Sequence, residues 1–337
     1  MVMSMWRGAL WFSHGWRHYT RQGFQQRQKH FNDEEMLEDL SGKVYLVTGA
    51  NSGLGYATAH HLASKGGRVY LLCRSRERGE EAKQTIVERT GNSDLHVEVV
   101  DVSEQSSLAS FADRFLASGE RCDVLINNAG VMLQEKGEPT GDGLDRTFAT
   151  NTMGCFLLTK LLMPALEKSA PSRVVMVSSG GALTQKLDVE DLEFAKSKKW
   201  DGTLAYAQTK RAQIYLAELF AQKYKGNGVY FYSMHPGWAD TPGVSTSMPQ
   251  FYDKLKDRLR TAEQGADTIN WLATARHINT EEMNGRLFED RATVSPFIRW
   301  TATQSSKEDV EKLWQKLHEK ADFSDEHREE WMEKRME

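Results

Sequence analysis

A glycine-rich turn at residues 48–55, Thr-Gly-Ala-Asn-Ser-Gly-Leu-Gly, constrains the fold of this chain more than any other feature. It follows a β-forming run at 43–47 and precedes a helix-like stretch. Gly49 would let the chain turn sharply off the strand, Gly53 would let the backbone approach a pyrophosphate, and Gly55 would let helix and strand pack closely. Free N–H groups at the start of the helix would bind the phosphates. The residues expected to form this dinucleotide site are Gly49, Asn51, Ser52, Gly53, Leu54 and Gly55.

Further β-forming runs alternate with helix-like stretches along the chain. They lie at 68–72, 95–100, 124–126, 173–177 and 229–234. The connections are long enough for crossovers between parallel strands, and this alternation is typical of a sheet with helices on both faces. We therefore predict an α/β fold with a single doubly wound parallel sheet, the Rossmann fold, in a catalytic domain that spans residues 40–300.

Two flanking segments differ in composition from this region. Residues 1–32 contain no acidic side chain and carry four arginines and one lysine among several aromatic residues. For a basic aromatic arm at 1–39 two interpretations stay open. It is either a targeting segment or one that lies on an anionic membrane surface, or it is a helical arm packed on the catalytic domain or on a partner subunit. Residues 301–337 are rich in Glu and Lys with apolar residues at helical spacing, which predicts a charged helical extension.

The charge and the cysteines limit the classes of partner and compartment. The formal net charge is -4, so no global basic field would recruit nucleic acid. Cys73, Cys122 and Cys155 are odd in number and lack the spacing of a metal site. This pattern argues against a disulfide framework and favours a reducing intracellular compartment. Cytoplasmic, membrane-surface and mitochondrial locations all stay open.

The end of the second β-forming run indicates which nicotinamide dinucleotide would bind. Sites for NAD(H) usually carry an acidic residue there, which accepts hydrogen bonds from the ribose. Here Cys73 takes that place and Arg74 follows it. A guanidinium suits a 2′-phosphate, so NADP(H) is favoured over NAD(H), with an ordinary surface arginine as the alternative. Other residues expected beside the cofactor follow the third and fourth runs, namely Asp101, Val102, Asn128, Ala129 and Gly130.

Tyr206 and Lys210 form the strongest catalytic pattern, because residues four apart on a helix share a face. Hydride transfer to a carbonyl leaves an alkoxide that needs a proton, and tyrosine ordinarily titrates too high to supply it readily. A nearby ammonium is expected to lower the pKa of Tyr206. Ser179, after the fifth run, could donate to the substrate oxygen as charge develops on it, with Ser178 as the alternative.

The glycine spacing and four ordered side chains resemble the classical short-chain dehydrogenase/reductase family over about residues 40–300. The four are Asn151, Ser179, Tyr206 and Lys210. The resemblance implies that Asn151 anchors a proton-relaying water and that Lys210 also holds the nicotinamide ribose. It further implies that Pro236, Gly237 and Thr241 contact the cofactor, and it makes a homodimer through the helices that carry Asn151 and Tyr206 plausible.

The stretch between Ser179 and Tyr206 is longer than in compact members of the family and resembles the retinol-dehydrogenase-like branch. Residues 180–203 would then shape or cover a pocket for a small carbonyl or alcohol, and the branch implies a lipidic substrate. Motifs such as Gln264-Gly265-Ala266 resemble one member of the dehydrogenase/reductase series, which narrows the relationship without naming a substrate. The alternative function is a regulatory or scaffold protein that binds NADP(H) with little turnover.

Overall fold

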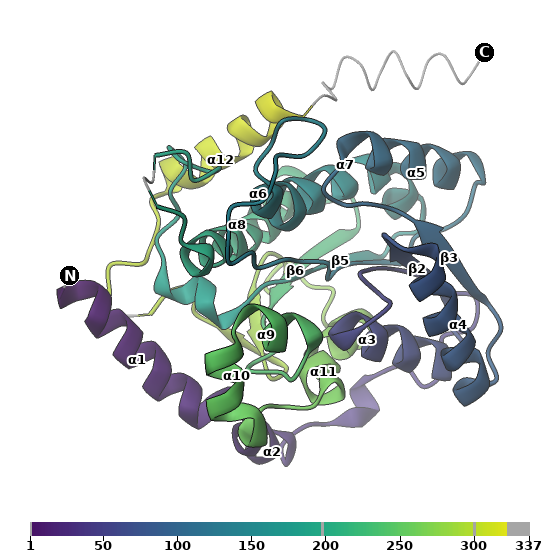
Figure 1. The fold of residues 1–337 in the computed structure, drawn as a ribbon. Coiled ribbons are helices and arrows are strands. Elements are labelled where there is room, and N and C mark those ends of the chain that lie inside the picture. The colour runs from purple at the N-terminus through teal and green to yellow at the C-terminus, as the bar shows by residue number, and fades with distance from the viewer. Residues whose placement is uncertain (1, 197–198, 299–300, 322–337) are drawn as a thin grey trace.

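The computed structural model describes residues 2–196, 199–298 and 301–321. Its centre is an eight-stranded sheet in the order β3-β2-β1-β4-β5-β6-β7-β8 (Figure 1). The strands are β1 (Val44–Thr48), β2 (Arg68–Cys73), β3 (Leu95–Val99), β4 (Val124–Asn127), β5 (Ser172–Val177), β6 (Val229–Met234), β7 (Leu287–Glu289) and β8 (Ala292–Val294). All neighbours pair in parallel except β7 and β8. The predicted doubly wound sheet is confirmed.

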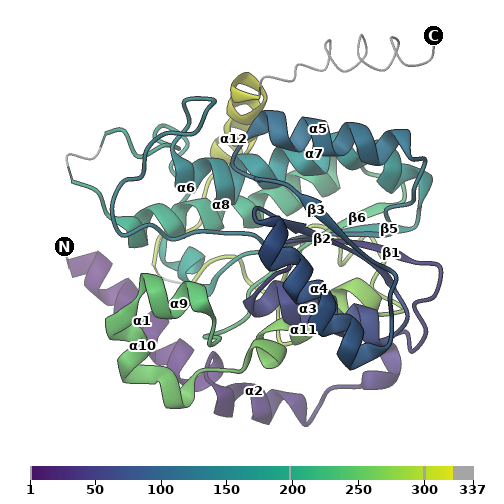
Figure 2. The same ribbon diagram turned by 45° about the vertical axis from the view of Figure 1, so that its right-hand side comes forward.

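Helices cover both faces of the sheet (Figures 1 and 2). One layer consists of α3 (Gly53–Ser64), α4 (Arg76–Thr90) and α11 (Ala262–Thr274), and the other consists of α5 (Gln105–Ala117), α7 (Gly154–Lys168) and α8 (Gly202–Lys223). Each layer buries its own apolar core against the sheet, because the strands present apolar side chains to both sides. The strand order reverses between β1 and β4, and in such sheets ligands bind in the crevice at that point.

The final hairpin of the sheet was not predicted from the sequence. β7 and β8 have three residues each, too few to show an alternating pattern, and they pair in antiparallel fashion through a tight turn. Asp290 and Arg291 form that turn with φ of 48° and 61°. This hairpin adds one antiparallel pair to the predicted parallel sheet.

The N-terminal arm forms two helices, α1 (Val2–His18) and α2 (Arg21–Gln28), followed by the short η1 (Asp33–Glu35). Both views place α1 beside the helical pair α9 (Pro242–Ser247) and α10 (Pro249–Leu255) (Figures 1 and 2). Shorter elements complete the chain, namely α6 (Arg146–Phe148), η2 (Ala149–Met153), η3 (Gly180–Thr184) and η4 (Lys256–Arg258). Within the described residues, no helix is both long enough and apolar enough to cross a membrane.

The last described helix, α12 (Lys307–Lys320), packs across α7 and α8. Its Leu313 and Leu317 are fully buried, and its Trp314 ring lies 5.3 Å from Phe156 of α7 and 5.0 Å from Phe220 of α8, between ring centroids. The predicted helical extension thus has one apolar side against the domain over this range. The part of the prediction on residues 322–337 lies outside the described residues.

Candidate active site

The glycine turn forms a narrow cradle between β1 and the start of α3. A Cβ atom on Gly55 would stand 2.3 Å from the Gly49 carbonyl oxygen and 2.5 Å from Asn128 Nδ2, so any larger residue would force helix and strand apart. Asn128 closes the cradle from β4 by donating to the Thr48 carbonyl at 2.8 Å. The Thr48 hydroxyl in turn accepts from the N–H groups of Asn128 and Ala129. This close backbone packing fits the approach of a pyrophosphate.

A cavity of about 1050 Å³ extends from this cradle along the carboxyl ends of the strands. Every residue predicted to bind cofactor or take part in catalysis lines it, except Gly55 and Asn151. Gly55 does not face the cavity because it packs against the Gly49 carbonyl and the Asn128 side chain. The volume is large enough for a dinucleotide with a small molecule beside it.

Tyr206 and Ser179 meet at the end of the cavity away from the glycine turn. Both side chains line the cavity, and the Gly181 N–H donates to Ser179 Oγ at 3.2 Å. Ser179 is half-buried and faces the cavity. Ser178, the alternative, is buried and donates its hydroxyl to the Lys210 carbonyl at 2.7 Å. The geometry therefore assigns Ser178 to holding α8 and leaves Ser179 available to a substrate.

Lys210 lies over one face of the Tyr206 ring. Its Nζ is 5.6 Å from the Tyr206 ring centroid and donates to the Val177 carbonyl at 2.8 Å. Burial raises the pKa of Tyr206 to about 12, against the smaller lowering effect of the Ser179 hydrogen bond. Burial also lowers the pKa of Lys210 to about 8. The expected lowering of the Tyr206 pKa by Lys210 is not found here, because burial dominates the pKa values of both groups.

Asn151 joins α8 to the loop that follows β4. It sits in η2, a π-helical turn that leads into α7, and such turns often occur at functional sites. Its amide donates to the Val131 carbonyl at 2.9 Å and to Thr209 Oγ1 at 3.0 Å, and its Oδ1 accepts from the Val131 N–H at 2.8 Å. Asn151 therefore fixes the loop after β4 against α8. Its contact on α8 is Thr209, the residue before Lys210.

Comparison with known proteins agrees with this geometry. Residues 43–191 match the short chain dehydrogenase family. Human dehydrogenase/reductase SDR family member 12 is 42% identical over 319 residues, which make up 95% of this chain and 99% of that protein. The chain belongs to the short-chain dehydrogenase/reductase family. Human retinol dehydrogenase 11 is 37% identical, over 82% of this chain and 84% of its own length.

The fold comparison points the same way. A crystal structure of an uncharacterised protein from Mycobacterium paratuberculosis has a TM-score of 0.68 and 26% identity, and the match covers 87% of this chain and 98% of that one. Membership of the family makes the chain an oxidoreductase with a site for a nicotinamide dinucleotide. The cradle, the cavity and the Tyr-Lys pair are the parts of this short-chain dehydrogenase/reductase that such a cofactor would contact.

The adenosine end of the cavity carries two guanidinium groups. Arg74, the residue predicted to favour NADP(H), follows β2, is exposed and lines the cavity. Arg78, in the first turn of α4, also lines the cavity. It was not among the residues predicted from the sequence to bind the cofactor. Its spacing was the available signal, because a residue four positions beyond Arg74 in a helix-like stretch can return to the same side. Asp101 accepts from Ser103, through both the backbone N–H and the hydroxyl, and so shapes the loop after β3.

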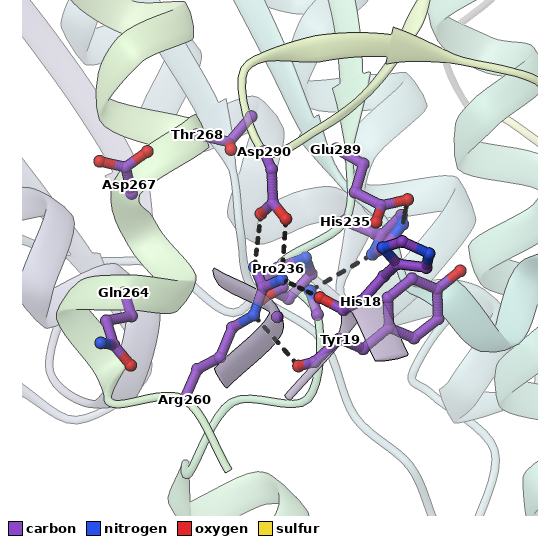
Figure 3. Close-up of polar contacts among 12 residues, drawn as sticks. His18, Tyr19, His235, Pro236, Arg260, Gln264, Asp267, Thr268, Glu289 and Asp290 are labelled. Atoms are coloured by element: carbon purple, nitrogen blue, oxygen red, sulfur yellow. Dashed lines mark hydrogen bonds and ion pairs between the residues drawn. The ribbon is translucent and has the colours of Figure 1, made fainter. Parts of the chain in front are cut away.

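Arg260 connects the turn that begins at Pro236 to the end of the N-terminal helix α1 (Figure 3). Arg260 donates to the Pro236 carbonyl at 3.3 Å, to the His18 carbonyl at 2.6 Å and to the Tyr19 carbonyl at 3.1 Å. Gly237 has a φ of 69°, and a Cβ there would stand 2.5 Å from the Arg260 guanidinium. Arg260 is fully buried, and the sequence offered no local signal for it. The arm is therefore part of the support of the cofactor site.

Proposed function

We propose that this oxidoreductase uses NADP(H) to interconvert a carbonyl and an alcohol, with Tyr206 as the general acid/base. The observation that carries the proposal is that Tyr206, Ser179 and Lys210 line the same cavity as the glycine cradle. The nicotinamide, when bound, would supply or accept the hydride. The chain itself must then orient the carbonyl and manage one proton.

Each polar group has a separate task in that reaction. Ser179 Oγ donates to the carbonyl oxygen, and the Tyr206 hydroxyl donates the proton that completes the alcohol. In the reverse direction Tyr206 accepts that proton. Lys210, with a pKa of about 8, can exchange protons near neutral pH. Asn151 positions this helix and the loop that faces it.

Preference for the phosphorylated cofactor rests on charge. Arg74 and Arg78 both line the adenosine end of the cavity. Two guanidinium groups suit the dianionic 2′-phosphate of NADP(H) far better than the neutral hydroxyl of NAD(H). The substrate end is apolar, with Val244, Met248 and Phe251 among its lining residues. That lining favours a substrate with an extended hydrocarbon part.

A panel of aldehydes and ketones with NADPH tests the function. We expect turnover by the wild type and a loss of at least about 100-fold in kcat for Tyr206→Phe, which keeps the ring and removes the exchangeable proton. Tyr230→Phe, a change on β6 away from the cavity lining, is the matched control and should retain activity. Turnover that survives Tyr206→Phe would refute the assigned role.

We also propose that the outer side of α1 rests on an anionic lipid surface. Trp6, Phe12 and Trp16 are 56%, 43% and 43% exposed, and they are three of the five large apolar side chains exposed in the described part of the chain. The basic side chains Arg17 and Arg258 accompany them, and Arg258 stacks on Trp16. Exposed aromatic residues beside basic ones favour an interfacial position. Replacing all three aromatic residues by serine should abolish flotation with phosphatidylserine vesicles, and unchanged flotation would contradict the proposal.

A further inference from the structure

We propose that Trp11 of the N-terminal helix is a specificity-determining residue that forms one wall of the substrate end of the cavity. The inference rests on the proposed function, since it names the substrate class that the same site would select. An apolar, flat or extended group next to the reacting carbonyl is the part of the substrate that Trp11 would contact.

The position of Trp11 relative to the reactive groups carries the proposal. Its indole lines the cavity that Ser179 and Tyr206 also line. Its Nε1–H donates to the Gly180 carbonyl at 2.8 Å, one residue beyond Ser179. This hydrogen bond satisfies the polar edge of the indole, so the rest of the ring can serve as an apolar surface. A residue 168 positions away in the chain thus lies beside the predicted catalytic serine.

The arm holds Trp11 in place through contacts on the same side of α1. Trp11 and Gly15 are four apart on α1 and so share a helix face. Tyr19 follows the end of the helix, and its N–H donates to the Gly15 carbonyl at 2.7 Å. Gly15 lets the helix approach Trp238 so closely that a Cβ there would stand 2.4 Å from the Trp238 ring. Tyr19 is fully buried, and its carbonyl accepts from the Trp238 N–H at 2.8 Å. The wall is therefore fixed by packing and not by one side chain.

Aromatic rings continue this wall toward α9 and α10. Trp11 lies 5.6 Å from Trp238, and Trp238 lies 5.3 Å from Phe251 in an edge-to-face arrangement, measured between ring centroids. Val244 and Tyr252 pack into the same cluster. A surface of this kind gains binding energy from hydrocarbon in proportion to the apolar area that it covers. Substrates with a long or flat apolar part should therefore bind better than short polar ones.

The test separates substrate contact from catalysis by using an unreactive probe. Binding of decanamide to the NADP⁺-loaded enzyme is measured by calorimetry, and kcat/KM with NADPH is measured for decanal and propanal. For Trp11→Ala we expect roughly a tenfold weaker decanamide Kd and a similar fall in the decanal-to-propanal ratio. Trp11→Phe keeps a ring and should fall in between. Trp6→Ala, which removes an exposed ring from the same helix, should leave both values unchanged.

The Kd for NADPH reports whether the arm stays docked, because the arm supports the Pro236–Gly237 turn. It should be the same in the wild type, Trp11→Phe and Trp11→Ala. A decanamide Kd that is unaffected in both Trp11 variants would overturn the proposal, as would a wild type that does not bind decanamide. Trp11-dependent decanamide binding without turnover of any carbonyl would support the wall and refute the proposed catalytic function instead.

Discussion

Arg260 and Asp290 form a bidentate ion pair with distances of 2.6 and 3.0 Å, and both side chains are only 1% exposed. The pair connects the edge hairpin, through Asp290, to the loop that follows η4. Because Arg260 also donates to the carbonyls of Pro236, His18 and Tyr19, one buried cation ties the N-terminal arm to the turn of the cofactor site (Figure 3). Removing either partner would leave the other charge buried without compensation.

We therefore expect Arg260→Met to lower the free energy of unfolding by about 3 to 5 kcal/mol, the usual cost of an unpaired buried charge. Arg258→Met is the matched control, since Arg258 is exposed and stacks on Trp16. Its effect should be within about 0.5 kcal/mol. Urea denaturation measures both, and Arg260→Met combined with Asp290→Leu should recover part of the loss. If Arg260→Met and Arg258→Met lowered the free energy of unfolding by the same amount, the buried ion pair would contribute no more to stability than an exposed arginine.

The groups that could be predicted from the sequence are those whose function imposes local spacing. The glycine turn and the Tyr206–Lys210 pair depend on neighbours within one helical turn, so their pattern is visible in the chain. Arg260 and Trp11 are different, because their partners lie 242 and 169 residues away. No local pattern distinguishes a buried arginine from an exposed one. Packing on the domain was one of two interpretations left open for the arm, and its contact with the cavity could not be derived.

The pKa of Tyr206 illustrates a second limit of the sequence. The spacing to Lys210 correctly placed both residues on one face of α8, but it did not give the distance between their polar atoms. Lys210 donates to the Val177 carbonyl, and burial raises the pKa of Tyr206 to about 12. Such a value depends on how much surrounding structure excludes water, which only the packed fold determines.

The two arginines at the adenosine end give a prediction on cofactor preference. Arg74→Ala combined with Arg78→Ala should weaken NADPH binding by at least about 100-fold, since each charge-assisted contact to a phosphate contributes about 1.5 to 3 kcal/mol. NADH binding should change little. Arg76→Ala is the internal control, because Arg76 lies between them in sequence, is exposed and does not line the cavity. Fluorescence titration of both cofactors measures the ratio, and an unchanged NADPH-to-NADH preference in the double variant would refute the assignment.

Lys210 gives a prediction that links stability to pH. Burial lowers its pKa from an ordinary 10.5 to about 8. Between pH 8 and pH 10.5 the unfolded chain therefore binds more protons than the folded protein. The free energy of unfolding rises with pH through that window, because the cost of burying the charged Lys210 disappears as the folded protein loses its proton. Below pH 8 both states are protonated and the full penalty applies. Lys210→Met should then stabilise the fold by about 3 kcal/mol at pH 7 and by progressively less above pH 8, while abolishing turnover.

Thermal and urea unfolding at pH 7, 9 and 10.5 measure that dependence. Lys254→Met, a change at an exposed position on α10, should show no comparable gain at any of these values. A Lys210→Met variant that is less stable than the wild type at pH 7 would mean that the contact of Nζ with the Val177 carbonyl outweighs the cost of burying the charge.

The position of α12 bears on the oligomeric state. The family resemblance implies dimers through the helices that carry Asn151 and Tyr206, yet α12 lies across α7 and α8 and buries Leu313 and Leu317 against them. A surface already covered by the chain itself is not free for a partner. We therefore expect a monomer by light scattering at micromolar concentration. Leu313→Asp should displace α12 and expose the apolar side of α7 and α8, which would produce self-association. Glu319→Lys, a change at an exposed position of α12, should keep the monomer, and a wild-type dimer would contradict the covering role of α12.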